Sequence, residues 1–449
     1  MDRREFIKKA GYAAAGVAIG TTGMSAASYR RINGANDRVN VAVVGYSDRF
    51  KGSLLPAFQA HCEKQNFDII GVSDLWRLRR EEGQSTMETR FGHKIRTYVN
   101  NEKMYEDKDV DAVIISTADF QHALHAAEAA ENGKDAYVEK PFAETMADAR
   151  VAKAAIEKAG TIVQIGSQRR SAPNYHAANE YLNSGKFGDI VMVEMTWNVN
   201  QPGRWRRPNT VPLLKQEDTD WKRYLMNRPW QEFDPRKYLE FRLFWPFSSG
   251  IPGQWMAHQI DTVHWFTGYN YPRSVAANGG IYLWNDGRTN FDTMTAVLDY
   301  GPQDNPAKGF QVIYSSRFTN SAGGVKEIYY SNGGELNLDT NMVTPNGGMS
   351  ARDAAAMGMS ENKLDSFSLS AAAKASTEAN TGGDPMTLAH MLNWMECVRS
   401  RKQPNANYMA GYNHSIACIM VTAALRTHEF TVFDPATQEV MAGGKPFQY

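Results

Sequence analysis

Residues 136–141 read Ala-Tyr-Val-Glu-Lys-Pro and place a charged pair and a proline directly after an apolar run. The run predicts the end of a buried strand, and in an open parallel sheet ligands bind beyond that edge. Lys140 in such a position can bind a substrate hydroxyl and exchange a proton with it. The alternative is a charged surface turn, since such dipeptides are common in loops. The segments upstream decide between these two interpretations.

Upstream of this segment, short apolar runs alternate with helical patterns. The runs cover residues 39–45, 67–72 and 110–115, and a helix is expected after each. This alternation predicts an α/β fold with a doubly wound parallel sheet, here a Rossmann domain over residues 38–166.

The pattern changes after about residue 167. Segments such as 190–198 and 293–299 alternate apolar and polar residues, which predicts an antiparallel sheet and hence a second domain over residues 167–449. Residues 344–385 are rich in small and polar residues. We expect an irregular excursion there, as an oligomer arm or a lid.

The turn after the first run carries a degenerate dinucleotide fingerprint. Its three glycine positions hold Gly45, Ser47 and Phe50, so its place between a strand and a helix is the main argument for it. Asp74 ends the second run, where a carboxylate accepts ribose hydroxyls and repels a 2′-phosphate, which favours NAD. Three arginines within residues 77–80 could bind a 2′-phosphate, so NADP is the alternative cofactor. The alternative role of Asp74 is to cap a helix.

Residues 1–30 have the features of a twin-arginine signal peptide. Arg3 and Arg4 precede a weakly apolar run over 10–23, and small residues follow at 25–27. We therefore expect export to the periplasm by the twin-arginine machinery, after the folded protein has taken up its nucleotide in the cytoplasm. A plain amphipathic helix is the alternative.

Composition excludes some classes of function. Lys plus Arg and Asp plus Glu both number 49 in 449 residues, and this balance argues against nucleic-acid binding. Cys62, Cys397 and Cys418 show no metal-ligand spacing, so inert thiols are expected. His258, Asp261 and His264 recur every three residues, which carries them around a helix instead of along one face, so no metal site is expected.

Several segments in this order resemble the Gfo/Idh/MocA oxidoreductase family. The resemblance rests on Val41–Gly45, Asp74, Ser116–His122, Glu139–Pro141, Gly166–Arg170, His258–Asp261 and Arg399–Pro404. It implies an NAD(P)-dependent enzyme with a Rossmann domain and an α/β domain on an open, mostly antiparallel sheet. Its implied substrates are sugars, cyclitols and their derivatives.

The resemblance also assigns roles to single residues. Lys140 matches the lysine that holds the reacting hydroxyl beside the nicotinamide, His122 a residue near that ring, and His258 a histidine that faces the substrate. Many members carry an aspartate four residues before that histidine, where this chain has Gln254. Glutamine cannot accept a proton. Lys140 or His258 must then be the base, or the ordinary reaction is lost.

Further binding residues are expected in the same segments. Thr117 and Glu139 are expected to contact the cofactor, with Gly45, Ser47, Asp74, His122 and Lys140. Arg170, Gln254, His258 and Asp261 are expected to bind the substrate. Seven of the ten tryptophans lie between Trp197 and Trp265. Most should fill the core, and one or two should touch a sugar.

These features predict an exported, NAD-dependent oxidoreductase that acts on a carbohydrate or glycoside and is a homo-oligomer. One alternative is an NAD-dependent glycosidase that works through a transient keto sugar. A second is a non-catalytic sugar-binding protein, for which the degenerate glycine turn and Gln254 argue.

Overall fold

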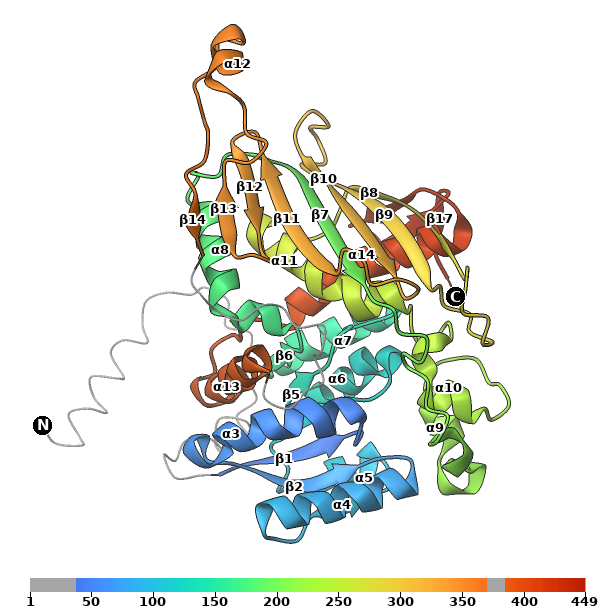
Figure 1. Cartoon of the computed structure of the whole chain (residues 1–449). Coiled ribbons are helices and arrows are strands. Elements are labelled where there is room, and N and C mark those ends of the chain that lie inside the picture. The colour runs from blue at the N-terminus through green and yellow to red at the C-terminus, as the bar shows by residue number, and fades with distance from the viewer. Residues whose placement is uncertain (1–37, 370–383, 449) are drawn as a thin grey trace, which may run out of the picture.

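The computed structural model describes residues 38–369 and 384–448. These residues form two sheets with helices between and around them (Figure 1). The signal peptide expected at residues 1–30 lies outside the described residues. Within the two described ranges, no helix combines the length and the apolar character needed to cross a membrane.

The first sheet is parallel and has the strand order β3-β2-β1-β4-β5-β6. Val41 and Val43 of β1 point into one apolar cluster, and Ala42 and Val44 point into another. A strand buried on both faces requires an unbroken apolar run, which is why its sequence does not alternate. The strands are β1 (Val39–Val44), β2 (Phe67–Ser73), β3 (Arg96–Tyr98), β4 (Ala112–Ile115), β5 (Asp135–Val138) and β6 (Val163–Ile165).

Helices connect these strands and confirm the predicted doubly wound domain. Each crossover returns the chain to the same edge, so the strands run parallel. The helices are α3 (Leu55–Gln65), α4 (Arg77–Phe91), α5 (Asn101–Tyr105), α6 (His122–Glu131) and α7 (Met146–Ala159).

The second sheet is open and mostly antiparallel, as expected. Among its described strands, only β7 and β10 pair in parallel. Its order is β14-β13-β12-β11-β7-β10-β9-β8-β15-β16-β17. The strands are β7 (Ile190–Asn198), β8 (Ser274–Gly280), β9 (Thr293–Tyr300), β10 (Phe310–Arg317), β11 (Val325–Ser331), β12 (Gly334–Asn337), β13 (Met342–Thr344), β14 (Phe367–Ser368), β15 (Thr431–Asp434), β16 (Glu439–Ala442) and β17 (Lys445–Pro446).

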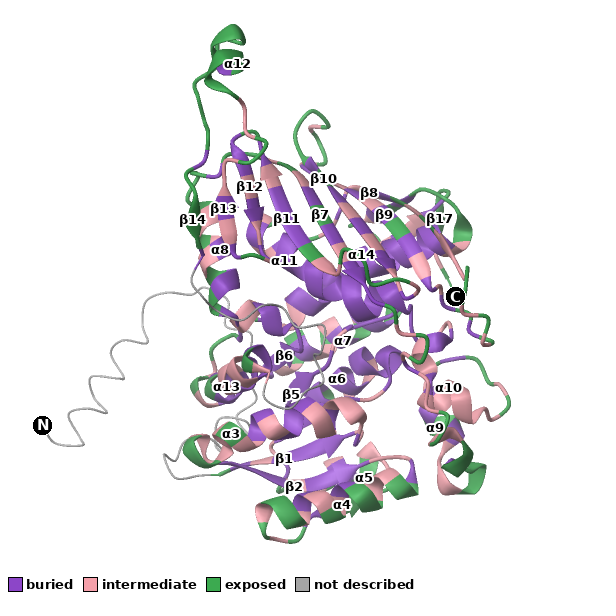
Figure 2. Ribbon diagram, in the orientation of Figure 1, coloured by how far each residue is buried: buried purple, intermediate pink, exposed green. Residues whose placement is uncertain are grey.

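Three helices lie on the face of this sheet that is turned toward the first domain: α8 (Pro173–Asn183), α11 (Ala257–Thr267) and α14 (Tyr408–Thr427). Figure 2 shows α11 and α14 buried between the two sheets. A helix that is apolar on nearly every side is stable only in such a place. These helices therefore bind the two domains into one core.

The last part of the chain also completes the first domain. Helix α13 (Pro385–Ser400) packs against α3, and its buried Trp394 lies 5.9 Å from the ring of Phe67. Arg399 donates to the carbonyl of Gln65 at 2.7 Å. The boundary expected at residue 166 therefore leaves out one helix of the nucleotide-binding domain.

The expected excursion at 344–385 is only partly irregular. Its described part contains α12 (Ala351–Ala356) and β14, and α12 projects from the end of the second sheet (Figure 1). The projection points away from the first domain, so this described part does not cover the edge of the first sheet.

A different segment reaches that edge. Residues 199–251, the bridging segment, lead from β7 back toward the first domain and contain α9 (Trp221–Leu225) and α10 (Pro235–Leu239) (Figure 1). Three ion pairs connect the bridging segment to the first domain: Arg207–Asp48 at 2.9 Å, Arg77–Asp218 at 2.8 Å and Arg223–Glu102 at 2.7 Å.

A fourth ion pair of the bridging segment is buried, and we expect it to stabilise the fold. Arg228 lies 3.1 Å from Asp148 on α7, with both side chains almost fully buried. Arg228→Met leaves that carboxylate without its cation and should lower the free energy of unfolding by about 3–5 kcal/mol. Chemical denaturation measures the change.

Arg96→Met is the matched control, because Arg96 forms half-exposed ion pairs with Asp107 and Asp109. The loss of these exposed pairs should lower the free energy of unfolding by at most about 1 kcal/mol. Equal losses from the two substitutions would contradict the role of the buried pair.

Candidate active site

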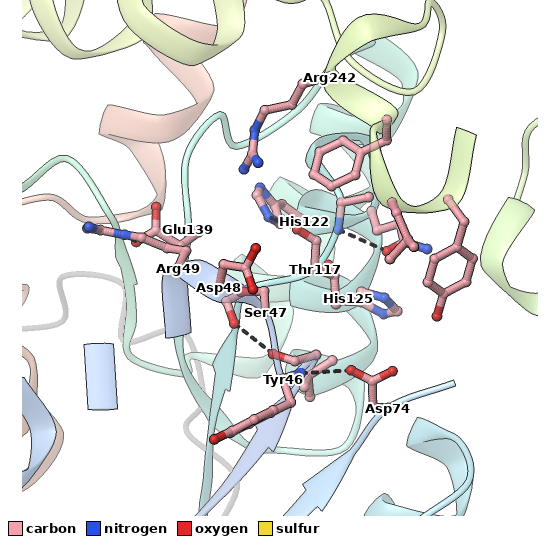
Figure 3. Close-up of a pocket in the computed structure, with 18 of the residues that line it drawn as sticks. Tyr46, Ser47, Asp48, Arg49, Asp74, Thr117, His122, His125, Glu139 and Arg242 are labelled. Atoms are coloured by element: carbon pink, nitrogen blue, oxygen red, sulfur yellow. Dashed lines mark hydrogen bonds and ion pairs between the residues drawn. The ribbon is translucent and has the colours of Figure 1, made fainter. Parts of the chain in front are cut away.

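A cavity of about 400 Å³ lies at the carboxyl edge of the first sheet. Residues that follow β1, β2, β4 and β5 line it, and residues of the bridging segment complete the wall (Figure 3). The strand order reverses between β1 and β4 at this edge. Open α/β sheets bind ligands at such a reversal.

The turn after β1 is shaped for the close approach of a phosphate. Gly45 has a φ of +83°, and a Cβ there would lie 2.7 Å from Cγ2 of Thr117, so only glycine fits. The Ser47 hydroxyl accepts the N–H of Phe50 at 3.2 Å, where the helix that continues as α3 begins. Amides at a helix start favour phosphate. The degenerate fingerprint therefore retains the geometry that suits a dinucleotide.

Asp74 follows β2 and also lines the cavity. Its two carboxylate oxygens accept the backbone N–H groups of Tyr46 at 2.8 Å and of Trp76 at 2.9 Å (Figure 3). Burial raises the pKa of Asp74, and these hydrogen bonds oppose that shift. The bond to Trp76 makes a turn just before α4, but Trp76 is the N-cap residue of this helix, so Asp74 does not cap it. Each oxygen keeps a lone pair for a ribose hydroxyl.

Lys140 faces the cavity just beyond β5. Its ammonium donates to the backbone carbonyl of Gln254 at 2.6 Å and lies 3.5 Å from the side-chain oxygen of the same residue. Burial lowers the pKa of Lys140 to about 8, although Glu139 and Asp119 oppose this shift. A lysine with this pKa can both hold and release a proton near neutral pH.

Glu139 is paired with an arginine that the sequence analysis did not identify. Its carboxylate lies 2.8 Å from Nε of Arg49, in the turn after β1. Burial alone would raise the pKa of Glu139, but the charges of Arg49 and Lys140 outweigh it, so the pKa is lowered. This pair joins the turns after β1 and β5 across the switch point.

His122 is held between two backbone carbonyls. Nδ1 lies 2.8 Å from the oxygen of Pro141, and Nε2 lies 3.2 Å from the oxygen of Thr117. Burial lowers its pKa, so the ring is neutral and can donate to only one of the two. His122 thus fixes the loops after β4 and β5 relative to each other.

His258 lines the cavity from α11. Its ring stacks on Trp197 with centroids 5.8 Å apart. Burial lowers the pKa of His258 well below its usual value, and the charge of Lys140 lowers it further. The ring is therefore neutral, and this shift makes it a weak proton acceptor.

Asp119 supplies a carboxylate beside Gln254. The Gln254 amide donates to Asp119 at 2.5 Å, and the Ser248 hydroxyl donates to the same oxygen at 2.6 Å. Position 254 has no carboxylate, but Asp119 of the first domain supplies one nearby. The Gln254 side chain lies between Asp119 and Lys140. The sequence analysis gave Asp119 no role, because 135 residues separate the two contacting positions.

Arg170 and Asp261 are not brought to the cavity. Arg170 contacts the Asp261 carboxylate at 2.7 Å, and Asp261 is fully buried. Burial would raise the pKa of Asp261, but Arg170 outweighs it and lowers the pKa. His264 on the same helix contacts the Tyr300 hydroxyl at 2.9 Å. These groups join α11 to its neighbours. Arg170 and Asp261 do not line the cavity, although both were expected to bind the substrate.

The bridging segment supplies wall residues that the sequence analysis did not single out as a site. Arg204 and Arg242 line the cavity. Three of the seven clustered tryptophans also line it: Trp205 of the bridging segment, and Trp197 and Trp255 just before and after it in the chain. Contact of one or two of them with a sugar stays a prediction. The density of arginine and aromatic residues in this segment was the available signal.

Comparisons with known proteins agree with this geometry. Residues 39–167 match the family model described as "Oxidoreductase family, NAD-binding Rossmann fold". The chain is 36% identical over 89 residues to scyllo-inositol 2-dehydrogenase (NAD(+)) of Bacillus subtilis, covering 20% of this chain and 26% of that protein. It is 25% identical over 213 residues to inositol 2-dehydrogenase of Salmonella typhimurium, covering 47% and 60%. The chain thus spans between about a quarter and three fifths of these relatives.

Solved structures share the fold of both domains. Levoglucosan dehydrogenase in complex with NADH and levoglucosan aligns with a TM-score of 0.60 at 14% identity, covering 88% of this chain and 98% of that one. Myo-inositol 2-dehydrogenase of Lactobacillus plantarum aligns with a TM-score of 0.61 at 15% identity, covering 88% and 100%. This likeness shows the fold alone, whereas the family match covers the nucleotide site itself. Residues 39–167 are therefore an NAD-binding Rossmann domain, and they match the family model of the Gfo/Idh/MocA oxidoreductases.

Proposed function

We propose that the protein oxidises a ring hydroxyl of a carbohydrate or glycoside with NAD. The observation that carries the proposal is the position of Lys140, whose pKa of about 8 places proton exchange near neutral pH at the ligand-binding edge of the sheet. Relatives named for inositol and levoglucosan support a polyhydroxylated substrate.

The residues of this chain divide the work as follows. NAD, when bound, would accept the hydride. The turn at Gly45 would hold the pyrophosphate, and Asp74 would hold the adenosine ribose. Lys140 would bind the reacting hydroxyl and take its proton, and neutral His258 would offer the substrate a hydrogen bond from the facing wall. The aromatic wall of the bridging segment would keep water from the reacting carbon.

A second candidate function follows from the same bridging segment. Its ion pairs to the first domain join side chains that line a cavity suited to the cofactor, which favours a cofactor retained through many turnovers. Glycoside cleavage through a transient keto sugar regenerates NAD in each cycle and fits a retained cofactor. The two reactions differ in their products: net NADH and a keto sugar for oxidation, a free sugar without net redox change for cleavage.

Lys140→Met tests the mechanism common to both candidates. We expect NAD binding to persist and turnover to fall by at least about 10²–10⁴, because the group that accepts the proton is lost. In the unmodified protein kcat/KM should rise with pH through about 8, since Lys140 accepts a proton only when it is uncharged. Full turnover by the variant, or a rate independent of pH between 6 and about 9, would contradict this role.

The contact between Asp119 and Gln254 gives a sharper test. Asp119→Asn removes a negative charge that raises the pKa of Lys140, so the rise of kcat/KM should move to lower pH. Gln254→Asp alone places two carboxylates together and should impair folding or turnover.

The double variant Asp119→Asn with Gln254→Asp exchanges the two groups and keeps the charge of the pair. We expect it to recover activity relative to Gln254→Asp alone. A double variant as poor as the product of the single effects would show that the two residues act independently.

We also propose that the protein is exported, on the basis of residues 1–30. Arg3→Lys with Arg4→Lys should leave the precursor in the cytoplasm, because paired arginines are the feature that the export machinery reads. Cell fractionation checks this, and normal export of the double variant would reject it. Homo-oligomerisation also stays a prediction, which sedimentation velocity can decide.

A further inference from the structure

Most charged groups around the cavity are neutralised by a partner. Four carboxylates of the wall have a basic partner between 2.7 and 2.9 Å away. The pairs are Glu102–Arg223, Glu128–His125, Asp48–Arg207 and Glu139–Arg49. In the three pairs that contain an arginine the charges offset each other, so these pairs do not call for a charged ligand.

Arg204 is different. Its guanidinium lies over the Trp255 ring, 5.8 Å from the centroid, and donates to the side-chain oxygen of Gln201 at 3.0 Å. It forms no ion pair with any carboxylate among residues 38–369 and 384–448. Stacking on an indole stabilises the cation but does not neutralise it. Burial and the nearby charges of Arg242 and Arg207 lower the pKa of Arg204 to about 10.

Arg242 is only weakly neutralised. Its nearest carboxylate oxygen belongs to Asp119 and is 3.6 Å away, beyond hydrogen-bond distance. Its Nε is buried and has no hydrogen-bond partner among the described residues. A buried donor without a partner costs about 1–3 kcal/mol unless a ligand supplies an acceptor. In Figure 3 the guanidinium points toward His122, on the side of the cavity away from Asp74.

Lys140 adds a third cation to this end of the cavity. Lys140, Arg204 and Arg242 line the same cavity, and the charge of Arg242 acts on both of the other two. The acids that act on Lys140 are Glu139, which is paired with Arg49, and Asp119, one of whose oxygens already accepts from Ser248 and Gln254. No acid of the described residues acts on Arg204, so the three cations outnumber the acids that act on them.

We propose that the substrate is an anionic sugar, whose carboxylate, phosphate or sulfate group binds Arg204 and Arg242 while its reacting hydroxyl meets Lys140. The inference rests on the proposed oxidoreductase function and names the substrate class of the same site. Guanidinium groups bind such oxyanions with paired hydrogen bonds.

The pyrophosphate of the cofactor is the competing anion for these arginines. It belongs at the turn from Gly45 to Phe50, where the helix start and the glycine conformation suit it. Arg204 instead lies over the ring of Trp255. Arg242 lies nearest to Asp119, which accepts a hydrogen bond from Gln254, a residue expected to bind the substrate. The test therefore measures cofactor binding separately.

Calorimetry on the protein loaded with NADH gives the test, because NADH cannot oxidise an alcohol and the sugars stay intact. The probes are matched pairs: methyl β-glucuronide against methyl β-glucoside, galacturonate against galactose, and glucose 6-phosphate and glucose 6-sulfate against glucose. At least one acid should bind roughly 10- to 100-fold more tightly than its neutral partner. That advantage should shrink as ionic strength rises. The pair with the largest ratio identifies carboxylate, phosphate or sulfate.

Arg204→Gln and Arg242→Gln should each remove most of this advantage and leave NADH affinity unchanged. Arg352→Gln, on the exposed face of α12, is the control for the loss of one positive charge. It should change neither the preference for acids nor the affinity for NADH. Equal affinity for acids and neutral sugars would overturn the inference. So would weaker NADH binding in the Arg204 or Arg242 variant, which would assign these arginines to the cofactor.

Failure of the proposed function has a different signature. Selective binding of an acid by the NADH-loaded protein, without any change in that acid when NAD is supplied, supports the anionic site and rejects the redox reaction. Turnover of neutral sugars with NAD, without selective binding of any acid, supports the redox reaction and rejects the anionic site.

Discussion

The hydrogen bond from Lys140 to the backbone of Gln254 joins the two domains at the cavity, and the proposed chemistry depends on it. Lys140 belongs to the first domain, yet its hydrogen bond goes to the backbone carbonyl of Gln254 in the second. A neutral acceptor fixes the ammonium in place without the large rise in pKa that a direct carboxylate contact would cause. The relative position of the domains therefore sets both the place and the acidity of this group.

The domains hold that position through buried contacts. Helices α11 and α14 lie between the sheets, and Arg228 of the bridging segment pairs with Asp148 on α7 with both side chains almost fully buried. Buried ion pairs are weak evidence for stability, but they fix geometry strongly, because misplacement leaves a charge without compensation. The bridging segment thereby closes the cavity and orients its own wall residues.

Asp119 and Gln254 together place a carboxylate and an amide near the lysine. The carboxylate comes from the turn before α6, and the glutamine amide separates it from Lys140. Its negative charge still acts on Lys140, and the amide orientation is fixed because its nitrogen must face Asp119. The same arrangement leaves Arg204 and Arg242 with little negative charge, and that imbalance gives the cavity a preference for anions.

The sequence by itself determined the elements and the residues attached to their ends. An apolar run buried on both faces can form only a central parallel strand, so 39–44 and 67–73 identified β1 and β2, and with them the places of Gly45 and Asp74. Lys140 was found from its place after an apolar run, His122, His258 and Gln254 from the resemblance to a family, and all four line the cavity. Local periodicity carries this information because each element forms by contacts between residues near in the chain.

Only the tertiary structure decided which distant side chains meet. The partnership of Asp119 with Gln254, the pairing of Arg170 with Asp261 away from the cavity, and the return of α13 to the first domain all join residues far apart in sequence. No spacing rule encodes such contacts, because they depend on how whole domains pack. The lack of an ion pair at Arg204 among the described residues is of the same kind. The sequence shows that the residue is charged, but only the fold shows that no carboxylate lies beside it.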